Sequence, residues 1–141
     1  MATPEALEYP ALCCSRDNSV VAVESASQLC SCNARALFRS HYFDDLLLFD
    51  FRATPYRVVA VEPASPLGQW KRLAARLLNR RLTVVLELER LGEPSLSRAK
   101  QTAIQWIHRA PEFWEAAYEI SEWEHRIAEA SGMKSLCAAF R

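Results

Sequence analysis

The segment His41-Tyr-Phe-Asp-Asp45 gathers one histidine and two carboxylates within five positions. His41, Asp44 and Asp45 are residue types that can bind a divalent metal or exchange protons with a substrate. The same residues also suit a turn, because a histidine stabilises the C-terminal end of a helix and aspartates are common before strands. We favour the turn and keep an enzyme built on this cluster as the third hypothesis for function.

Five cysteines could supply thiolate ligands or redox chemistry. Structural zinc sites favour cysteine pairs separated by about two to four residues, so that both sulfurs reach one ion. The adjacent Cys13-Cys14 pair and the Cys30-Ser-Cys32 pair fit that spacing poorly. We therefore predict free thiols, with Cys30 or Cys32 packed as a small hydrophobic side chain, and no metal or cofactor. A redox role for the cysteines stays open.

Sequence motifs for nucleotide binding and hydrolysis are absent. The chain has no GxGxxG, GxxxxGK[ST], GxSxG or HExxH pattern. Its three glycines are too few to favour a phosphate-binding glycine loop. We therefore expect a protein without catalytic activity.

The overall composition is that of one globular domain. Seventeen basic residues balance seventeen acidic ones, which argues against a dedicated nucleic-acid or anionic-membrane binder. We read no secretion signal, and no apolar run approaches the roughly 18 residues that span a bilayer. The excess of arginine over lysine and the abundant alanine suggest a bacterial gene of high GC content. We expect a cytoplasmic protein.

Charge is segregated along the chain. Residues 65–81 contain five basic side chains and no acidic one, whereas residues 111–130 contain six glutamates and a single arginine. The two segments could be separate solvated faces, or could face each other across the fold. They could also form a surface for a charged partner, because segregated charge steers association. The basic residues are Lys71, Arg72, Arg76, Arg80 and Arg81, and the glutamates are Glu112, Glu115, Glu119, Glu122, Glu124 and Glu129.

Aromatic residues add to the acidic segment. Trp114 and Tyr118 lie about a quarter turn or more away from the apolar stripe that Phe113, Ala117 and Ile120 would form on a helix. Tryptophan and tyrosine beside carboxylates are typical of interface hot spots. Burial of Trp114 and Tyr118 in a core is the alternative. We predict that Trp114, Glu115, Tyr118, Glu119 and Glu122 bind a partner, and that Lys71, Arg72, Arg76 and Arg80 bind an anion or a partner.

The elements that must position these residues follow from a repeat. The pentapeptide Val-Val-Ala-Val-Glu occurs at 20–24 and again at 58–62. Such a valine run is typical of a strand buried on both faces. A serine after each run, Ser27 and Ser65, is suited to capping a helix. In the second predicted helix the apolar positions Leu67, Trp70, Leu73, Ala74 and Leu77 recur at helical spacing and predict a buried face.

Two more apolar strands, at 44–52 and 82–90, complete the order β-α-β-β-α-β. This order predicts an α+β fold with the ferredoxin-like split βαβ arrangement, a four-stranded mainly antiparallel sheet with the repeats in its two central strands. Two or three further helices should follow, at 96–109, 111–132 and 133–140, and cover the open face of the sheet. We predict an N-terminal lead-in, 1–18, that is poorly ordered or extended, and one domain, 19–141, with a core at 19–90 and the C-terminal helices at 94–141.

These features together predict a non-enzymatic module that binds another protein through the acidic aromatic helix. A small neutral α+β protein with several tryptophans and no catalytic motif is similar to many toxin-neutralising immunity proteins, in general class and not in any motif. The second hypothesis is a small-ligand sensor or carrier that binds at the sheet face or beside the basic helix. We expect no membrane partner and no nucleic acid, and formation of a homodimer stays open.

Overall fold

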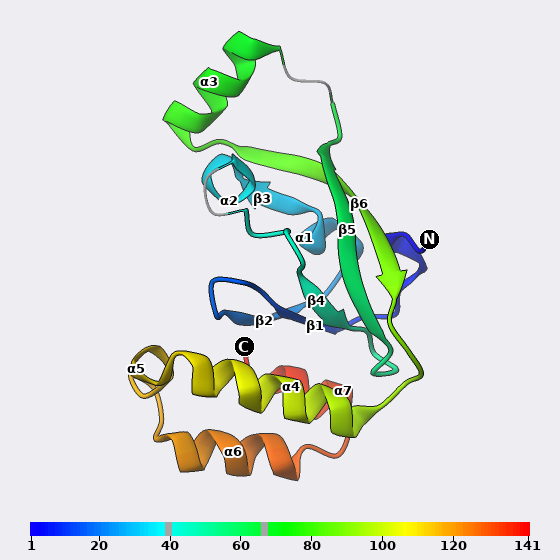
Figure 1. The fold of residues 1–141 in the computed structure, drawn as a ribbon, viewed down its shortest axis with the longest axis vertical. Coiled ribbons are helices and arrows are strands. Elements are labelled where there is room, and N and C mark those ends of the chain that lie inside the picture. Colours follow the sequence, from blue (N-terminus) through cyan, green and yellow to red (C-terminus); the bar gives the residue numbers. More distant parts are fainter. Residues whose placement is uncertain (39–40, 66–67) are drawn as a thin grey trace.

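The computed structural model describes residues 1–38, 41–65 and 68–141. The described chain forms both strands and helices up to residue 90 and helices alone after it (Figure 1). The strands are β1 (Ala11–Cys14), β2 (Val20–Val23), β3 (Ser31–Asn33), β4 (Leu47–Phe49), β5 (Pro55–Pro63) and β6 (Arg81–Arg90). The helices are the short 3-10 helix η1 (Pro4–Ala6) and α1 (Ala26–Leu29), α2 (Ala34–Phe38), α3 (Gln69–Leu78), α4 (Leu96–Arg109), α5 (Pro111–Trp114), α6 (Ile120–Glu129) and α7 (Met133–Ala138).

The strands form one antiparallel six-stranded sheet in the order β2-β1-β4-β5-β6-β3, curved into a half-barrel. The predicted α+β class is confirmed. Strands β4 and β5 pair as an antiparallel hairpin. The ferredoxin-like, four-stranded arrangement is wrong. The first valine repeat is the edge strand β2 rather than a central one, because β1 inserts between β2 and β4. The helix expected after that repeat is interrupted by β3, which pairs with β6.

Strand β1 lies inside the N-terminal segment 1–18 and joins the two cores of the molecule. All four of its residues are buried. Leu12 and Cys14 point towards a layer of helices, whereas Ala11 and Cys13 point into the half-barrel. This alternation follows from the two-residue period of a strand. Strand β1, which has no polar residue, is therefore covered on both faces.

Helices α4 and α7 pack on the outer face of the sheet at β1 and β2, and α6 packs against α4 on the side away from the sheet, as Figure 1 shows for the yellow to red end of the chain. Ala99, Ala103 and Ile107 of α4 are fully buried there, and the small alanines let the helix approach the sheet closely. Trp106 Nε1 donates a hydrogen bond of 2.7 Å to the carbonyl of Ser15 in the β1–β2 turn. The concave side of the half-barrel holds a second core that includes Phe43, Leu46, Leu48, Leu86 and Leu88.

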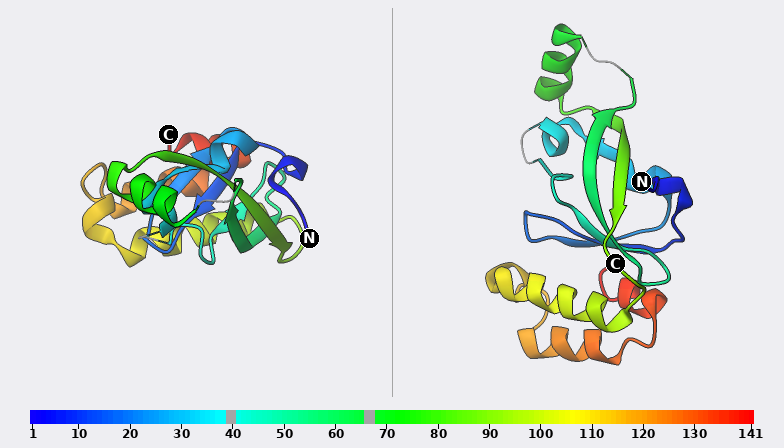
Figure 2. Two further views of the ribbon diagram at one scale, coloured as in Figure 1. Left: turned by 90° about the horizontal axis from the view of Figure 1, so that it is seen from above. Right: turned by 45° about the vertical axis from the view of Figure 1, so that its right-hand side comes forward.

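The long hairpin of β5 and β6 extends away from the helical layer (Figure 2, right). Its inward positions Val58, Val84 and Leu86 are buried, whereas Val59 and Val85 on the outer face are 40% and 57% exposed. Helix α3 connects the two strands at the end of the hairpin, opposite to α4 and α6.

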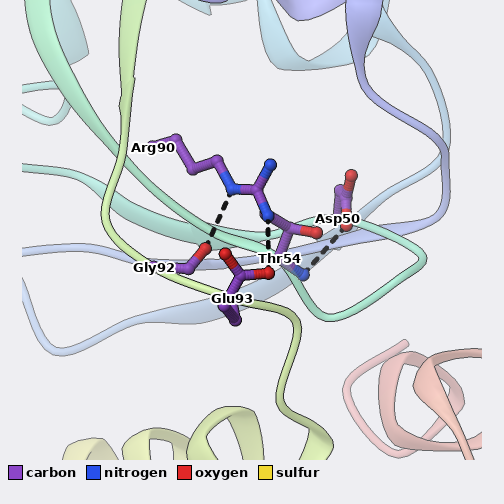
Figure 3. A network of polar contacts seen from close by, with 5 residues as sticks. All are labelled: Asp50, Thr54, Arg90, Gly92 and Glu93. Atoms are coloured by element: carbon purple, nitrogen blue, oxygen red, sulfur yellow. Dashed lines mark hydrogen bonds and ion pairs between the residues drawn. The ribbon is translucent and has the colours of Figure 1, made fainter.

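A polar network fixes the junction where the chain leaves the sheet for α4 (Figure 3). The buried Asp50 carboxylate accepts hydrogen bonds of 3.0 Å from the backbone N–H groups of Arg52 and Thr54. Arg90 donates to the carbonyl of Gly92 at 2.9 Å and to Glu93 at 3.2 Å. The β4–β5 turn and the end of β6 are thereby held in defined conformations, and α4 starts from a fixed point.

The single helix expected at 111–132 is two helices, α5 and α6, separated by a turn. Residues nine positions apart lie on opposite sides of a continuous α-helix, because each residue advances about 100° around the axis. The break instead brings the rings of Trp114 and Trp123 to 5.1 Å between centroids. Both tryptophans can therefore enter the same core.

Candidate functional site

The acidic aromatic segment divides into buried rings and exposed carboxylates. Trp114 is 7% exposed and Trp123 5%, and both belong to the core beneath the helical layer. Glu115, Glu119 and Glu122 are exposed, and Tyr118 is half-buried. The α5–α6 turn and the first turn of α6 thus present the predicted glutamates to solvent, while the Trp114 ring lies in the core. The partner-binding role of this set stays a prediction.

The exposed aromatic residue of this segment is Phe113, which the sequence pattern assigned to an inward stripe. Phe113 is 65% exposed, because Trp114, the last residue of α5, is the one that is buried in the core. Its ring contacts Trp114 edge-on, with 5.2 Å between centroids. A partner that approached the acidic segment would meet Phe113 rather than Trp114.

A cavity of about 580 Å³ lies between the α5–α6 turn, α6 and the end of α7. Trp123 stacks on Phe140 with 5.5 Å between centroids and 13° between planes, and Tyr118 meets Trp123 edge-on at 5.1 Å. The guanidinium of Arg126 lies 4.0 Å from the centroid of the Tyr118 ring. The aromatic residues of the segment therefore line this cavity and also belong to or pack against the core.

The basic segment contains a helix with an uncovered apolar face. Leu73, Leu77 and Leu78 of α3 are 47%, 72% and 62% exposed. At 100° per residue these three side chains fall within about 140° of one another on one side of the helix. Arg72 lies outside that arc and is also exposed. We call Leu73, Leu77 and Leu78 the leucine face.

The prediction that this helix buries its apolar stripe is wrong at Leu73, Ala74 and Leu77, which are all exposed. Helix α3 sits beyond the half-barrel, where the sheet offers no core to cover it. Its neighbour is α2, and the contacts beside it are polar: Ala34 N donates to Arg80 O at 2.8 Å, and Arg35 N donates to Asn79 Oδ1 at 3.2 Å.

The structure describes the side chains of only two of the four residues in the predicted basic set. Arg72 and Arg80 are exposed. Leu67 lies outside the described residues, and so do the side chains of Trp70, Lys71 and Arg76. The basic and acidic segments lie at opposite ends of the molecule, so they do not face each other (Figure 1).

The His41-Tyr-Phe-Asp-Asp45 segment forms a turn at the molecular surface. Asp44 N donates to the carbonyl of His41 at 3.0 Å, and both His41 and Asp45 adopt positive φ angles, 50° and 55°. His41 Nδ1 lies 3.6 Å from Asp44 Oδ2, and Arg16 lies 3.9 Å from the same oxygen. Asp44 and Asp45 line a cavity of about 450 Å³ together with Arg16 and Arg57. The structure therefore brings the side chains of His41 and Asp44 together at the surface, and the enzyme hypothesis stays untested.

All five cysteines are buried and free. Burial raises the pKa of the Cys13 thiol to about 12 and that of Cys137 to about 11. Thiols of this kind are poor nucleophiles and poor metal ligands near neutral pH, since the thiolate is the reactive form. Within residues 1–38, 41–65 and 68–141, His, Cys, Asp and Glu side chains form no group of three or more that could hold a metal ion.

Comparison with known proteins assigns no family. The sequence matches no protein-family model, and no curated protein or solved structure matches it. In the described part of the chain, every helix is too short or too polar to cross a membrane.

Sequence reasoning missed the leucine face, the exposure of Phe113 and the cavity beside Tyr118. The helical periodicity of residues 67–77 shows that α3 has an apolar side, but periodicity alone does not tell whether another element covers that side. No signal in the sequence marks the break after Trp114 clearly, since 115–119 contains neither proline nor glycine.

Proposed function

We propose that the protein is a non-enzymatic interaction module that binds an acidic protein partner through the leucine face of α3. The observation that carries this proposal is the exposure of Leu73, Leu77 and Leu78 on one side of a helix. Isolated exposed leucines are ordinary, but a continuous apolar stripe is typical of a binding surface.

The spacing of the leucines suits recognition in a groove. Leu73 and Leu77 are four residues apart, which is the anchor spacing of amphipathic helices that lie in apolar grooves of their partners. Helix α3 is already ordered at the end of a hairpin, so binding would cost less conformational entropy than folding of a free peptide.

Charge decides the class of partner. The segment 65–81 has five basic residues and no acidic one, so a groove with an acidic rim is its electrostatic complement. A rim of this kind raises the association rate and favours one orientation of the helix. An immunity-like role, in which the partner is a toxin, is one form of this proposal.

The leucine face is favoured over the acidic segment as the principal surface. Trp114, the residue expected to be the hot spot there, is occupied in the core with Trp123 and Phe140. The acidic segment offers Phe113 as a single exposed apolar anchor beside its glutamates, whereas α3 offers three leucines, and rim charges affect association rates more than affinity.

The test compares affinity capture from an extract of the source organism with three baits. The baits are the wild type, the double variant L73Q/L77Q, and the control V59Q/V85Q, which removes two exposed valines from the outer sheet face. We expect one partner that the wild type and the control retain and that L73Q/L77Q loses. With the purified partner, the affinity of the wild type should fall as salt rises, and L73Q/L77Q should bind at least about 30-fold more weakly, roughly 2 kcal/mol.

Three outcomes would contradict the proposal. The double variant could bind the purified partner as tightly as the wild type. The wild type could bind vesicles of mixed zwitterionic and anionic lipid through the leucines, which would make α3 a membrane-surface helix. Sedimentation could show a dimer that L73Q/L77Q dissociates, which would make a second copy of the chain the occupant.

A further inference from the structure

We propose that the cavity beside Tyr118 and Trp123 is a binding site for a small aromatic carboxylate. Its volume of about 580 Å³ falls in the range of small-molecule sites, roughly 300–1,000 Å³. Helices α5, α6 and α7, whose residues line the cavity, lie at the opposite end of the molecule from α3 (Figure 1). The inference therefore does not depend on the proposed docking of the leucine face.

The walls of the cavity suit a flat apolar group. Its lining includes five aromatic residues, of which Trp123 and Phe140 stack on each other with 13° between their planes and form one aromatic wall. Trp123 is almost fully buried and forms the inner part of the lining, whereas Phe113 is 65% exposed and lies at the rim. Aromatic groups pack well against such surfaces, edge-on or offset, and contribute more than their buried area alone. The aromatic residues are Phe113, Trp114, Tyr118, Trp123 and Phe140.

The remaining lining is made of small apolar side chains and two arginines. Ala116 and Ala117, both exposed, belong to this lining. The charged residues of the lining are Arg126 and Arg141, and none of the surrounding glutamates belongs to it. A ligand in this cavity would therefore meet positive charge.

Arg126 is the arginine that can bind the carboxylate of a ligand. Arg141 already pairs with Glu24 at 2.7 Å. Arg126 lies 3.5 Å from Glu122, its neighbour one turn earlier, and both side chains are about half exposed. An exposed pair of this kind is weak, so the guanidinium can exchange it for a bidentate contact with a ligand.

The rings could alternatively form a cage for an ammonium group, which aromatic faces attract. The guanidinium of Arg126 already occupies a position 4.0 Å from the centre of the Tyr118 ring. A cationic ligand would enter beside this positive charge and be repelled. The geometry therefore favours an anion over a cation of the same shape.

The experiment titrates the full chain with 2-naphthoate and with 2-naphthylmethylammonium, by calorimetry and by NMR of the indole N–H groups. We expect saturable one-to-one binding of the carboxylate, and binding of the ammonium compound weaker by about tenfold or more. The indole N–H of Trp123, which donates to the Trp114 carbonyl at 2.9 Å, should shift on binding. The indole N–H of Trp106, which donates to Ser15 and does not line the cavity, should shift less than that of Trp123.

Variants test the role of the guanidinium. Arg126→Met should weaken 2-naphthoate binding by about tenfold or more, since it keeps an unbranched apolar stem and removes the guanidinium charge. Ala117→Glu should also abolish binding, because it adds a negative charge to the lining at an exposed position that tolerates substitution. Arg109→Met is the matched control: Arg109 lies 4.5 Å from the centre of the Trp106 ring on α4, away from the cavity, and its loss should leave the affinity unchanged.

Three results would overturn the inference. They are the absence of saturable 2-naphthoate binding, equal or tighter binding of the ammonium compound, and wild-type affinity in a folded Arg126→Met variant. If Arg126→Met fails to fold, the outcome with Ala117→Glu decides: unchanged binding in that variant also rejects the site.

Discussion

The pair Trp114 and Trp123 allows a sharp test of the aromatic core, because the two side chains differ mainly in one hydrogen bond. They are 7% and 5% exposed, and both contact Phe140 as well as each other. Trp123 Nε1 donates to the Trp114 carbonyl at 2.9 Å, whereas Trp114 Nε1 is buried without a hydrogen-bond partner among the described residues. We predict that Trp114→Phe destabilises the protein less than Trp123→Phe.

The size of the difference follows from the polar atoms. Both substitutions remove the same atoms from similarly buried positions, so the losses of packing should be close to each other. Trp123→Phe also loses a hydrogen bond that contributes about 1 kcal/mol, although the Trp114 carbonyl still accepts from Ala117 N at 3.2 Å. Trp114→Phe instead removes an unsatisfied N–H, whose burial costs about 1–3 kcal/mol. The free energies of unfolding of the two variants should therefore differ by about 2 kcal/mol.

Urea denaturation followed by far-UV circular dichroism measures both variants without relying on tryptophan fluorescence. Equal slopes with urea would show that the two variants unfold to similar states. If Trp114→Phe is as destabilising as Trp123→Phe, or more so, the assignment of the unsatisfied indole is wrong.

Further predictions concern the turns and the thiols. Asp50→Ala should lower the free energy of unfolding by about 2 kcal/mol, measured by urea titration, because the N–H groups of Arg52 and Thr54 would lose a buried acceptor; an unchanged midpoint would contradict the network in Figure 3. Burial tends to raise the pKa of Asp17, but hydrogen bonds from Ser15 and Ser19 outweigh it and lower that pKa overall. A lowered pKa stabilises the fold above the unfolded value, about 3.9, so the stability advantage of the wild type over D17N should be full at pH 7 and disappear as the pH falls through the folded pKa. A difference that does not vary with pH would argue against these hydrogen bonds. The five buried cysteines should resist a thiol reagent at pH 8 in the native protein and all react in urea, whereas rapid labelling of Cys13 in the native state would contradict its burial.

The sequence predicts the regular, strongly patterned part of the fold. Strands β5 and β6 and helix α4 appear where long apolar patterns indicate them. The short strands are harder. Strand β1 has only four residues and no β-branched side chain, and β3 consists of Ser-Cys-Asn, which becomes a strand because β6 offers a partner. Both depend on long-range pairing, so local propensity carries little information about them. The ferredoxin-like order fails because these two strands were missed.

For the candidate surfaces, too, the sequence predicts local features but not their tertiary placement. The sequence locates the charge segregation and the amphipathic pattern of α3, because both are local properties. It does not show that α3 stands beyond the half-barrel, with Leu77 72% exposed. Nor does it show that the turn before α6 reverses the expected positions of Phe113 and Trp114. Tertiary placement decides which apolar side chains stay available to a partner.

The central claim is that the leucine face is uncovered in the free protein and is therefore available for binding. The most direct measurement is the free energy of unfolding of L73Q/L77Q relative to the wild type, with L86Q, which places an amide at a position only 1% exposed, as the buried reference. Glutamine has a helix propensity close to that of leucine, so an uncovered face predicts a change of no more than about 1 kcal/mol for the double variant. The buried reference should lose about 3 kcal/mol or more. A loss of that size in L73Q/L77Q would mean that the leucines are part of a core, and would contradict the account.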